Sequence, residues 1–408
     1  MLSQLSPAVR QYVLVTGNYW AFTLTDGALR MLVVLYFHQL GYSALEVALL
    51  FVFYEFFGVV TNLFGGWLGA RWGLNRTMNI GLGLQITALA LLLVPADWLT
   101  VVWVMAAQAL SGIAKDLNKM SAKSTIKLLV PDDQQGQLYQ WVALLTGSKN
   151  TLKGVGFFLG GLLLTLIGFQ GAVLALAAML TVVWVGSLVF LRRDSGKASF
   201  KPKFRDLLSK SRAINSLSAA RLLLFGARDV WFVVALPVFL AAQLGWDHWQ
   251  VGSFLALWVI GYGGVQAIAP RFTKAQQVSR YGALLTLAPL GLAAALWYGL
   301  PVSSSIIVGL GLFGVLFAIN SSLHSYLIVA HARADGVSLD VGFYYMANAA
   351  GRLLGTLLSG WVYQQAGLEA CLLISALMLA LSTLVITALP AAPQPTDFTE
   401  TKASESAQ

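Results

Sequence analysis

Long apolar stretches separated by short polar connections run through most of the chain. A membrane-spanning helix needs about 20 mostly apolar residues, and strands cannot satisfy their backbone groups alone in lipid. The predicted helical spans cover residues 12–38, 44–68, 77–96, 98–121, 138–167, 171–191, 215–241, 248–269, 281–299, 303–329, 341–365 and 369–390. The pattern therefore predicts an all-α membrane protein with twelve transmembrane helices.

Basic residues in the connections orient these spans. Lys or Arg occurs after spans 2, 4, 6 and 8, whereas the connections after spans 1, 3, 5, 7, 9 and 11 contain neither. Lys and Arg concentrate in cytoplasmic loops of membrane proteins. We therefore expect a multi-pass protein of the cell (inner) membrane, with both termini in the cytoplasm.

The longest basic connection falls near the middle of the chain. It predicts a cytoplasmic linker at 192–214 between an N-terminal six-helix bundle at 1–191 and a C-terminal six-helix bundle at 215–390. Residues 391–408 are rich in Pro, Ser, Thr and Glu, which predicts a disordered cytoplasmic tail.

The two predicted bundles also resemble each other in sequence. Leu40-Gly41-Tyr42 aligns with Leu244-Gly245-Trp246 at an offset of 204 residues. Asp26 and Asp229 lie within one residue of this offset, and so do Lys149 and Arg352. The coincidence indicates a duplicated six-span unit, and hence two pseudo-symmetric bundles.

Composition excludes several other classes of protein. Hydrophobic residues make up 58% of the chain and charged residues 11%, against about 25% charged in a soluble protein. One Cys and four scattered His favour neither a disulfide nor a metal site. No nucleophile–base arrangement is apparent. We therefore predict no catalytic residue, no cofactor and no metal. The net charge of +9 is explained largely by the orienting loops, so no nucleic-acid partner is expected.

Charged residues inside the predicted spans are unbalanced. The basic ones are Arg30, Lys115, Lys119, Lys149, Lys153, Arg221, Arg228 and Arg352. The acidic ones are Asp26, Glu55, Asp116 and Asp229. A charge within lipid costs about 2.5–3.5 kcal/mol or more unless it faces a partner or water. Four carboxylates cannot neutralise eight cations, so the pattern predicts an anionic substrate in a central cavity.

The lysines of the fourth and fifth spans recur at helical spacing. Lys115, Lys119, Lys123 and Lys127 lie four residues apart, and so do Lys149 and Lys153. Residues at i and i+4 share one face of a helix. We interpret Lys115, Lys119, Lys149 and Lys153 as substrate-binding residues. Lys123 and Lys127 are placed near the cytoplasmic rim, where fixing topology is the simpler role.

The arginines lie near the predicted mid-membrane, and Arg suits bidentate contact with a phosphate-type group. Arg352 and Arg228 are predicted ligands, with Arg228 expected to face away from its neighbour Asp229. Arg30 either binds substrate or pairs with Asp26 one turn away. Arg221 is placed nearer the cytoplasmic rim.

A local motif after the second span resembles the major facilitator superfamily. Residues 66–76 read Gly-Trp-Leu-Gly-Ala-Arg-Trp-Gly-Leu-Asn-Arg, which is similar to the superfamily's G-x-L-A-D-R-x-G-R-K loop. Ala70 replaces the usual Asp. The residues carried over to the gating loop are Gly66, Gly69, Arg71, Gly73 and Arg76.

This resemblance implies a cavity lined by spans 1, 4, 7 and 10. Tyr19 and Asn320 are then expected among the substrate-binding residues. Asp26, Asp229, Glu55 and His324 are candidates for proton coupling. The alternatives are salt bridges for the carboxylates and hydrogen-bonded packing for the histidine.

Three further segments, 18–30, 112–124 and 146–150, resemble ArsJ-type organoarsenical efflux permeases. They include Asn18-Tyr19-Trp20, Lys115-Asp116-Leu117-Asn118-Lys119 and Thr146-Gly147-Ser148-Lys149-Asn150. The resemblance implies alternating-access export of 1-arseno-3-phosphoglycerate, arsenate resistance and a functional link to a glyceraldehyde-3-phosphate dehydrogenase. We expect a monomer.

Two other functions remain open from the sequence. An organophosphate:phosphate exchanger or importer fits the buried cations equally well. A multidrug/proton antiporter would require a cavity rich in acids and aromatic residues, which the excess of Lys and Arg disfavours.

Overall fold

The computed structural model describes residues 7–41, 50, 52–131, 134–191, 197–199, 210–246 and 248–389. The helices within them are α1 (Pro7–Gln39), α3 (Val52–Trp72), α4 (Leu74–Leu91), α5 (Val101–Leu129), α6 (Gln135–Phe190), α7 (Arg212–Phe232), α8 (Ala235–Leu244), α9 (His248–Ile268), α10 (Val278–Trp297), α11 (Val302–His331) and α12 (Val337–Thr387). Short 3-10 turns lie at Ala96–Trp98, Ala269–Arg271 and Ala275–Gln277. The described chain is therefore all helical, as the hydrophobic pattern predicts.

The two longest helices each bend sharply at a glycine. Gly168 in α6 has φ 69° and Gly367 in α12 has φ 78°, a region of backbone space that favours glycine. Both lie in gaps between predicted spans. Conversely, α7 and α8 together correspond to one predicted span. Counted in this way, the described helices fit the twelve predicted segments.

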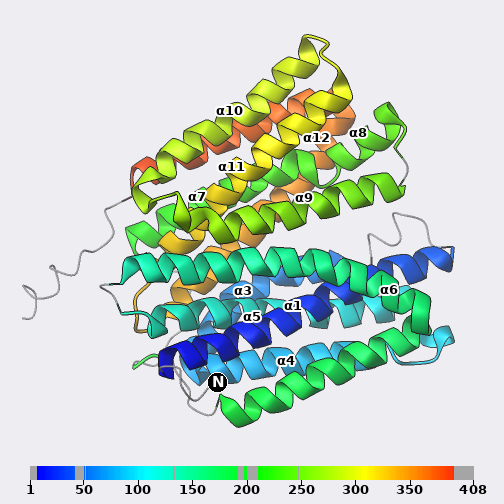
Figure 1. The fold of residues 1–408 in the computed structure, drawn as a ribbon, viewed down its shortest axis with the longest axis vertical. Helices are drawn as coiled ribbons and strands as arrows, with labels where there is room; N and C mark the ends of the chain where they lie inside the picture. The colour runs from blue at the N-terminus through cyan, green and yellow to red at the C-terminus, as the bar shows by residue number, and fades with distance from the viewer. Residues whose placement is uncertain are drawn as a thin grey trace, which may run out of the picture.

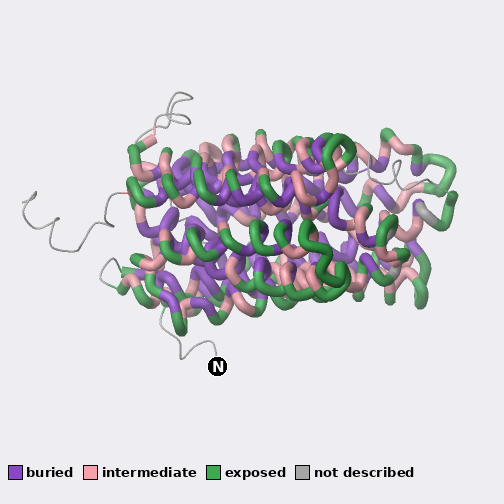
Figure 2. Tube along the Cα trace, turned by 90° about the horizontal axis from the view of Figure 1, so that it is seen from above, coloured by how far each residue is buried: buried purple, intermediate pink, exposed green. Residues whose placement is uncertain are grey.

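Seven of the described helices are long and apolar enough to cross a membrane, and α6 and α12 contain 56 and 51 residues. Large apolar side chains such as Leu166, Val182 and Leu357 are exposed on the outer surface. In Figure 2 the exposed positions lie along the outside of the helices and the buried positions between them. This distribution matches a surface in contact with lipid.

The fourth predicted span is longer in the structure than in the sequence analysis. Helix α5 starts at the Thr100 cap, where the Thr100 hydroxyl accepts a hydrogen bond from the backbone N–H of Trp103. It continues to Leu129, beyond the predicted end at residue 121. Lys123 and Lys127 therefore lie on the helix, and both are buried.

The two halves of the chain lie side by side (Figure 1), with α1 and α3–α6 in one and α7–α12 in the other. Helix α3 packs against α12, and α6 packs against α9 across the boundary. We call the end of the molecule where α1 begins and α12 ends the terminal side. The opposite end is the far side.

Candidate functional site: a basic cavity between the halves

A cavity of about 290 Å³ lies between the two halves. Helices α1, α3, α5 and α6 line it from the first half, and α7, α9, α11 and α12 from the second. Along α7 the lining runs from Arg221 to Val233, which is about 18 Å at 1.5 Å per residue. The cavity thus extends over much of the thickness of a bilayer core.

Eight basic side chains line this cavity. They are Lys115, Lys119, Lys123, Lys149, Lys153, Arg221, Arg228 and Arg352. Basic residues from four helices, α5, α6, α7 and α12, are therefore brought to one place. The sequence-predicted Tyr19 lies there too, and Tyr345 enters from α12.

Helical spacing explains how α5 and α6 supply most of these cations. Lys115, Lys119 and Lys123 all reach the cavity from one face of α5, and Lys149 and Lys153 do so from α6. Lys127 continues the series but is absent from the lining. Its ammonium group lies 3.4 Å from the backbone carbonyl of Ala330, to which it donates.

Two carboxylates, those of Asp26 and Asp116, line the cavity, and a third, that of Asp229, lies buried behind the lining. Asp116 pairs with Lys119 at 2.6 Å. Asp229 is fully buried and accepts from Arg228 Nε at 2.5 Å and from Arg352 Nε at 3.3 Å. Arg228 thus folds back onto the adjacent Asp229 rather than facing away from it, because its long side chain can turn around the backbone.

Asp26 meets a tyrosine rather than a basic side chain. Its carboxylate accepts from the Tyr54 hydroxyl at 2.8 Å. The Tyr54 ring also lies 3.8 Å from the Lys115 ammonium and 4.8 Å from the Arg30 guanidinium carbon. Arg30 therefore stands behind Tyr54 and is not part of the cavity lining.

The remaining lining cations have no carboxylate within ion-pair distance in the described part of the chain. Among the described residues, none lies within ion-pair distance of Lys149 or Lys153. Lys123 donates to the Thr146 hydroxyl at 2.8 Å, and Arg221 donates to Ser321 at 3.2 Å. The described lining therefore carries a clear excess of positive charge.

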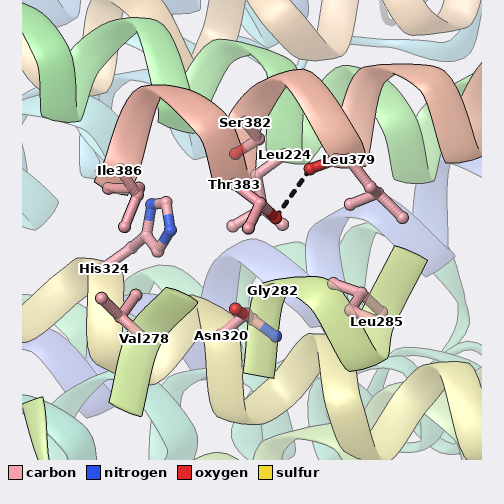
Figure 3. Close-up of a pocket in the computed structure, with 10 residues that line it drawn as sticks. All are labelled: Leu224, Val278, Gly282, Leu285, Asn320, His324, Leu379, Ser382, Thr383 and Ile386. Carbon is pink, nitrogen blue, oxygen red and sulfur yellow. Dashed lines mark hydrogen bonds between the residues drawn. The ribbon is translucent and has the colours of Figure 1, made fainter. Parts of the chain in front are cut away.

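The predicted residues Asn320 and His324 lie elsewhere. They face a separate space of about 10 Å³ between α10, α11 and α12, shown in Figure 3. Asn320 donates to the backbone carbonyls of Tyr281 and Leu316, both at 2.9 Å. Ser321, the next residue of α11, lines the main cavity instead. The predicted helix therefore lines the cavity, but through the neighbouring residue and a different face.

The gating-loop residues lie where the terminal side is closed. The Gly66 carbonyl accepts from the Ser338 hydroxyl at 2.7 Å, and Gly69 also approaches Ser338. Gly73 has φ 100° and connects α3 to α4. Arg71 stacks on the Trp67 ring at 5.0 Å. Arg76 is exposed.

The region around residues 197–199 joins both halves at the same end. The Ala198 N–H donates to the Ala70 carbonyl at 2.8 Å, and the Ser199 N–H donates to Asp335 at 2.8 Å. Lys210, just before α7, pairs with Asp340 of α12 at 3.4 Å and so fixes the start of the second half. The structure therefore shows the terminal side closed by contacts between the halves.

Several residues that line the cavity were not predicted to do so. Lys123 and Arg221 were interpreted as rim residues, yet their exposed fractions are 2% and 3%. Gln266 and Asn348 were not singled out, although both line the cavity. Their shared signal is an uncharged amide within an apolar span. Glu55 has a side chain outside the described part of the structure.

Comparisons with known proteins agree with this architecture. The family model described as Major Facilitator Superfamily matches residues 15–337. A search of curated proteins found no match.

Solved structures resemble the chain over nearly its whole length. The human organic anion transporter TETRAN has a TM-score of 0.76 at 17% identity, covering 94% of this chain and 100% of that one. The fucose:proton symporter of E. coli has 0.73 at 14%, covering 94% and 99%. A bacterial homologue of the iron transporter ferroportin, in an outward-facing state, has 0.71 at 13%, covering 92% and 98%. These likenesses establish the fold.

Proposed function

This chain belongs to the Major Facilitator Superfamily, and we propose that it transports a small organic anion carrying a phosphate or arsenate group. The superfamily consists of membrane transporters of small molecules. The substrate class is our inference from the cavity, because the structural neighbours share too little sequence to supply it.

The excess of basic side chains around the cavity is the observation that supports this proposal. Lys149 and Lys153 stand one helical turn apart, where like charges repel each other. Neither has a carboxylate within ion-pair distance among the described residues. An anion between them would remove this repulsion. A cationic substrate would increase it, which argues against a multidrug/proton antiporter.

We propose distinct roles for the residues around the anion. Lys115, Lys149 and Lys153 contribute charge from the first half, and Arg352 contributes a guanidinium from the second. Asp229 orients Arg352 and Arg228. Asp26 is kept as a candidate for proton coupling because its carboxylate lines the cavity and pairs with a neutral hydroxyl.

Transport would follow alternating access about this central site. Sites between the repeats near the membrane midplane are general in such transporters. The contacts of Gly66 with Ser338 and of Ser199 with Asp335 would open on the terminal side as the far side closes. Substrate shifts this equilibrium only through a difference in affinity between the two states.

The resemblance to ArsJ-type permeases makes the proposal more specific. It nominates 1-arseno-3-phosphoglycerate as substrate, export as direction and arsenate resistance as the outcome. A glyceraldehyde-3-phosphate dehydrogenase would supply the substrate. An organophosphate:phosphate exchanger or importer fits the same cavity, and transport assays are needed to separate the two.

Everted membrane vesicles that contain the protein provide this test. Arsenate alone, arsenite alone, and arsenate with the dehydrogenase, its cofactor and glyceraldehyde 3-phosphate are compared. We expect arsenic to accumulate only with the complete mixture. Uptake of bare arsenate would exclude the organoarsenical. Exchange of an ordinary triose phosphate for phosphate, without arsenic uptake, would favour the exchanger.

A further inference from the structure

Two buried cations, one from each half, lie at the terminal-side end of the cavity. Lys123 projects from α5 of the first half, and Arg221 from α7 of the second. Lys123 lies within electrostatic range of Arg221, Lys149 and Lys119. Both side chains are almost fully buried, so water screens their repulsion poorly.

Neutral groups hold these two cations in place. Lys123 donates one of its three N–H groups to the Thr146 hydroxyl at 2.8 Å. Arg221 donates through one terminal nitrogen to the carbonyl and hydroxyl of Ser321, both at 3.2 Å, and through the other to Ser325 at 3.5 Å. Hydroxyl and carbonyl oxygens orient the side chains without cancelling their charge.

Several hydrogen-bond donors beside them are unused within the described structure. Arg221 Nε, Gln266 Nε2 and Asn348 Nδ2 are buried and have no partner. Their residues are at least nine-tenths buried and line the cavity. A buried donor without a partner is destabilising, because the water that it loses is not replaced by another acceptor. Such groups are expected where a ligand supplies the missing acceptors.

Tyr345 completes this end of the cavity. Its ring lies 4.8 Å from the Lys119 ammonium and 5.0 Å from that of Lys123. Among the described residues, its buried hydroxyl meets no acceptor or donor with hydrogen-bond geometry. The Tyr345 ring therefore contacts both ammonium groups at the cavity wall. Its hydroxyl is available to donate to a bound acceptor.

We propose that Lys123, Arg221, Gln266, Asn348 and Tyr345 form a subsite for a tetrahedral oxyanion that bridges the two halves at the terminal-side end of the cavity. The inference rests on the proposed transport of an organic anion and locates one of its acidic groups. The unused donors outnumber the two oxygens of a carboxylate. A phosphate-type group, with three or four oxygens, can satisfy more of them.

This position links occupancy of the subsite to closure of the terminal side. With the subsite empty, repulsion between Lys123 and Arg221 pushes the halves apart. A bound oxyanion attracts both cations and draws the halves together. The substrate thus binds the terminal-closed state more tightly, which is the difference in affinity that a population shift requires.

The purified full chain, labelled for distance measurement, tests this link. Spin labels are placed at Arg76→Cys and Lys274→Cys, exposed positions on the terminal side of the two halves, in a Cys371→Ser background. Inorganic phosphate is the probe, and acetate is the carboxylate comparison. The same series includes Lys123→Gln, Arg221→Gln and Gln266→Leu, which removes donors without changing charge.

We expect phosphate to increase the terminal-closed population and acetate to do so far less. Lys123→Gln and Arg221→Gln should weaken the phosphate response by about tenfold or more, as loss of a charged hydrogen bond implies, and Gln266→Leu should weaken it by less. Arg10→Gln, at an exposed position of α1 outside the lining, removes one positive charge as a control and should keep the wild-type response to phosphate.

An undiminished phosphate response in both Lys123→Gln and Arg221→Gln would overturn the subsite. So would a wild-type chain that transports an organic anion but does not respond to phosphate, and in that case the proposed function would stand. If the wild type neither binds nor transports any anion, both proposals fail. Gln266→Leu gives an independent result if a charge variant does not fold.

Discussion

Asp229 on α7 holds Arg352 on α12 at 3.3 Å, with the carboxylate fully buried behind the cavity. Its other oxygen accepts from Arg228 at 2.5 Å. One negative charge therefore orients two guanidinium groups without neutralising both. This arrangement explains how the second half presents positive charge to the cavity while remaining well packed.

Replacing Asp229 with Asn should impair both stability and transport. Removing one partner of a buried ion pair costs about 3–5 kcal/mol, because the other charge is left without compensation. We expect a lower thermal unfolding temperature in detergent and a transport rate reduced by roughly tenfold or more. Asp97→Asn, at an exposed site, is the control. Wild-type transport by Asp229→Asn would show that the arginines need no such orientation.

Lys149→Ala and Lys153→Ala should each abolish most transport while leaving membrane insertion intact. A hydrogen bond to a charged group contributes about 1.5–3 kcal/mol, so affinity for an anion should fall by about 10-fold to 150-fold. Substrate uptake at several concentrations measures the loss. Lys274→Ala, on the exposed terminal side, should behave as the wild type. Full transport by Lys149→Ala, Lys153→Ala and Arg352→Ala would reject the cationic site.

Gly342→Ala should hinder closure of the terminal side. A methyl group at this position would lie 2.6 Å from the Asn62 carbonyl and 2.8 Å from Gly66 Cα. Because these neighbours are backbone atoms, α3 and α12 must move apart. We expect fewer terminal-closed molecules and slower transport. Gly360→Ala, on the same helix with open space around it, is the matched control, and equal effects of the two changes would contradict the prediction.

Asp335 should stabilise the closed terminal side at neutral pH. Hydrogen bonds from the Ser199 side chain and backbone lower the pKa of this carboxyl below its ordinary value of 3.8. The contact is therefore fully formed above that value and weakens as pH falls through the lowered pKa. Asp335→Ala should open the terminal side at about pH 7, where the carboxyl is ionised. Distances between spin labels report the change, and an unchanged distribution would assign closure to other contacts.

Most of the fold could be predicted from the apolar pattern, and much of the site from the charged residues within the apolar spans. Lengths of apolar sequence predicted the helices, and the gaps near Gly168 and Gly367 fell where the chain bends. Lys149 and Lys153 were expected to bind substrate because they share one face of an apolar span that lacks enough carboxylates to neutralise them. The structure places both in the cavity lining.

The other site residues could not be predicted because the sequence does not show how deep a residue lies along its helix or which way its side chain points around the helix axis. Lys123 was predicted to be a rim residue because α5 was expected to end at residue 121. Arg221 was placed near the rim because it lies towards the cytoplasmic end of its predicted span. Asn320 and Ser321 are adjacent, so only side-chain packing decides which one faces the cavity. Gln266 and Asn348 carry no charge, and the cost of burying them becomes visible only once their neighbours are known.

Equilibrium binding of a phosphorylated three-carbon acid tests the central claim most directly. 3-Phosphoglycerate, neutral glycerol and a lipophilic cation are titrated separately into the purified protein by calorimetry. We expect only the anion to bind, with an affinity that falls as salt screens the charges and that is lost in the Lys149→Ala, Lys153→Ala double variant. Binding of the cation with no binding of the anion would contradict an anion site between the two halves.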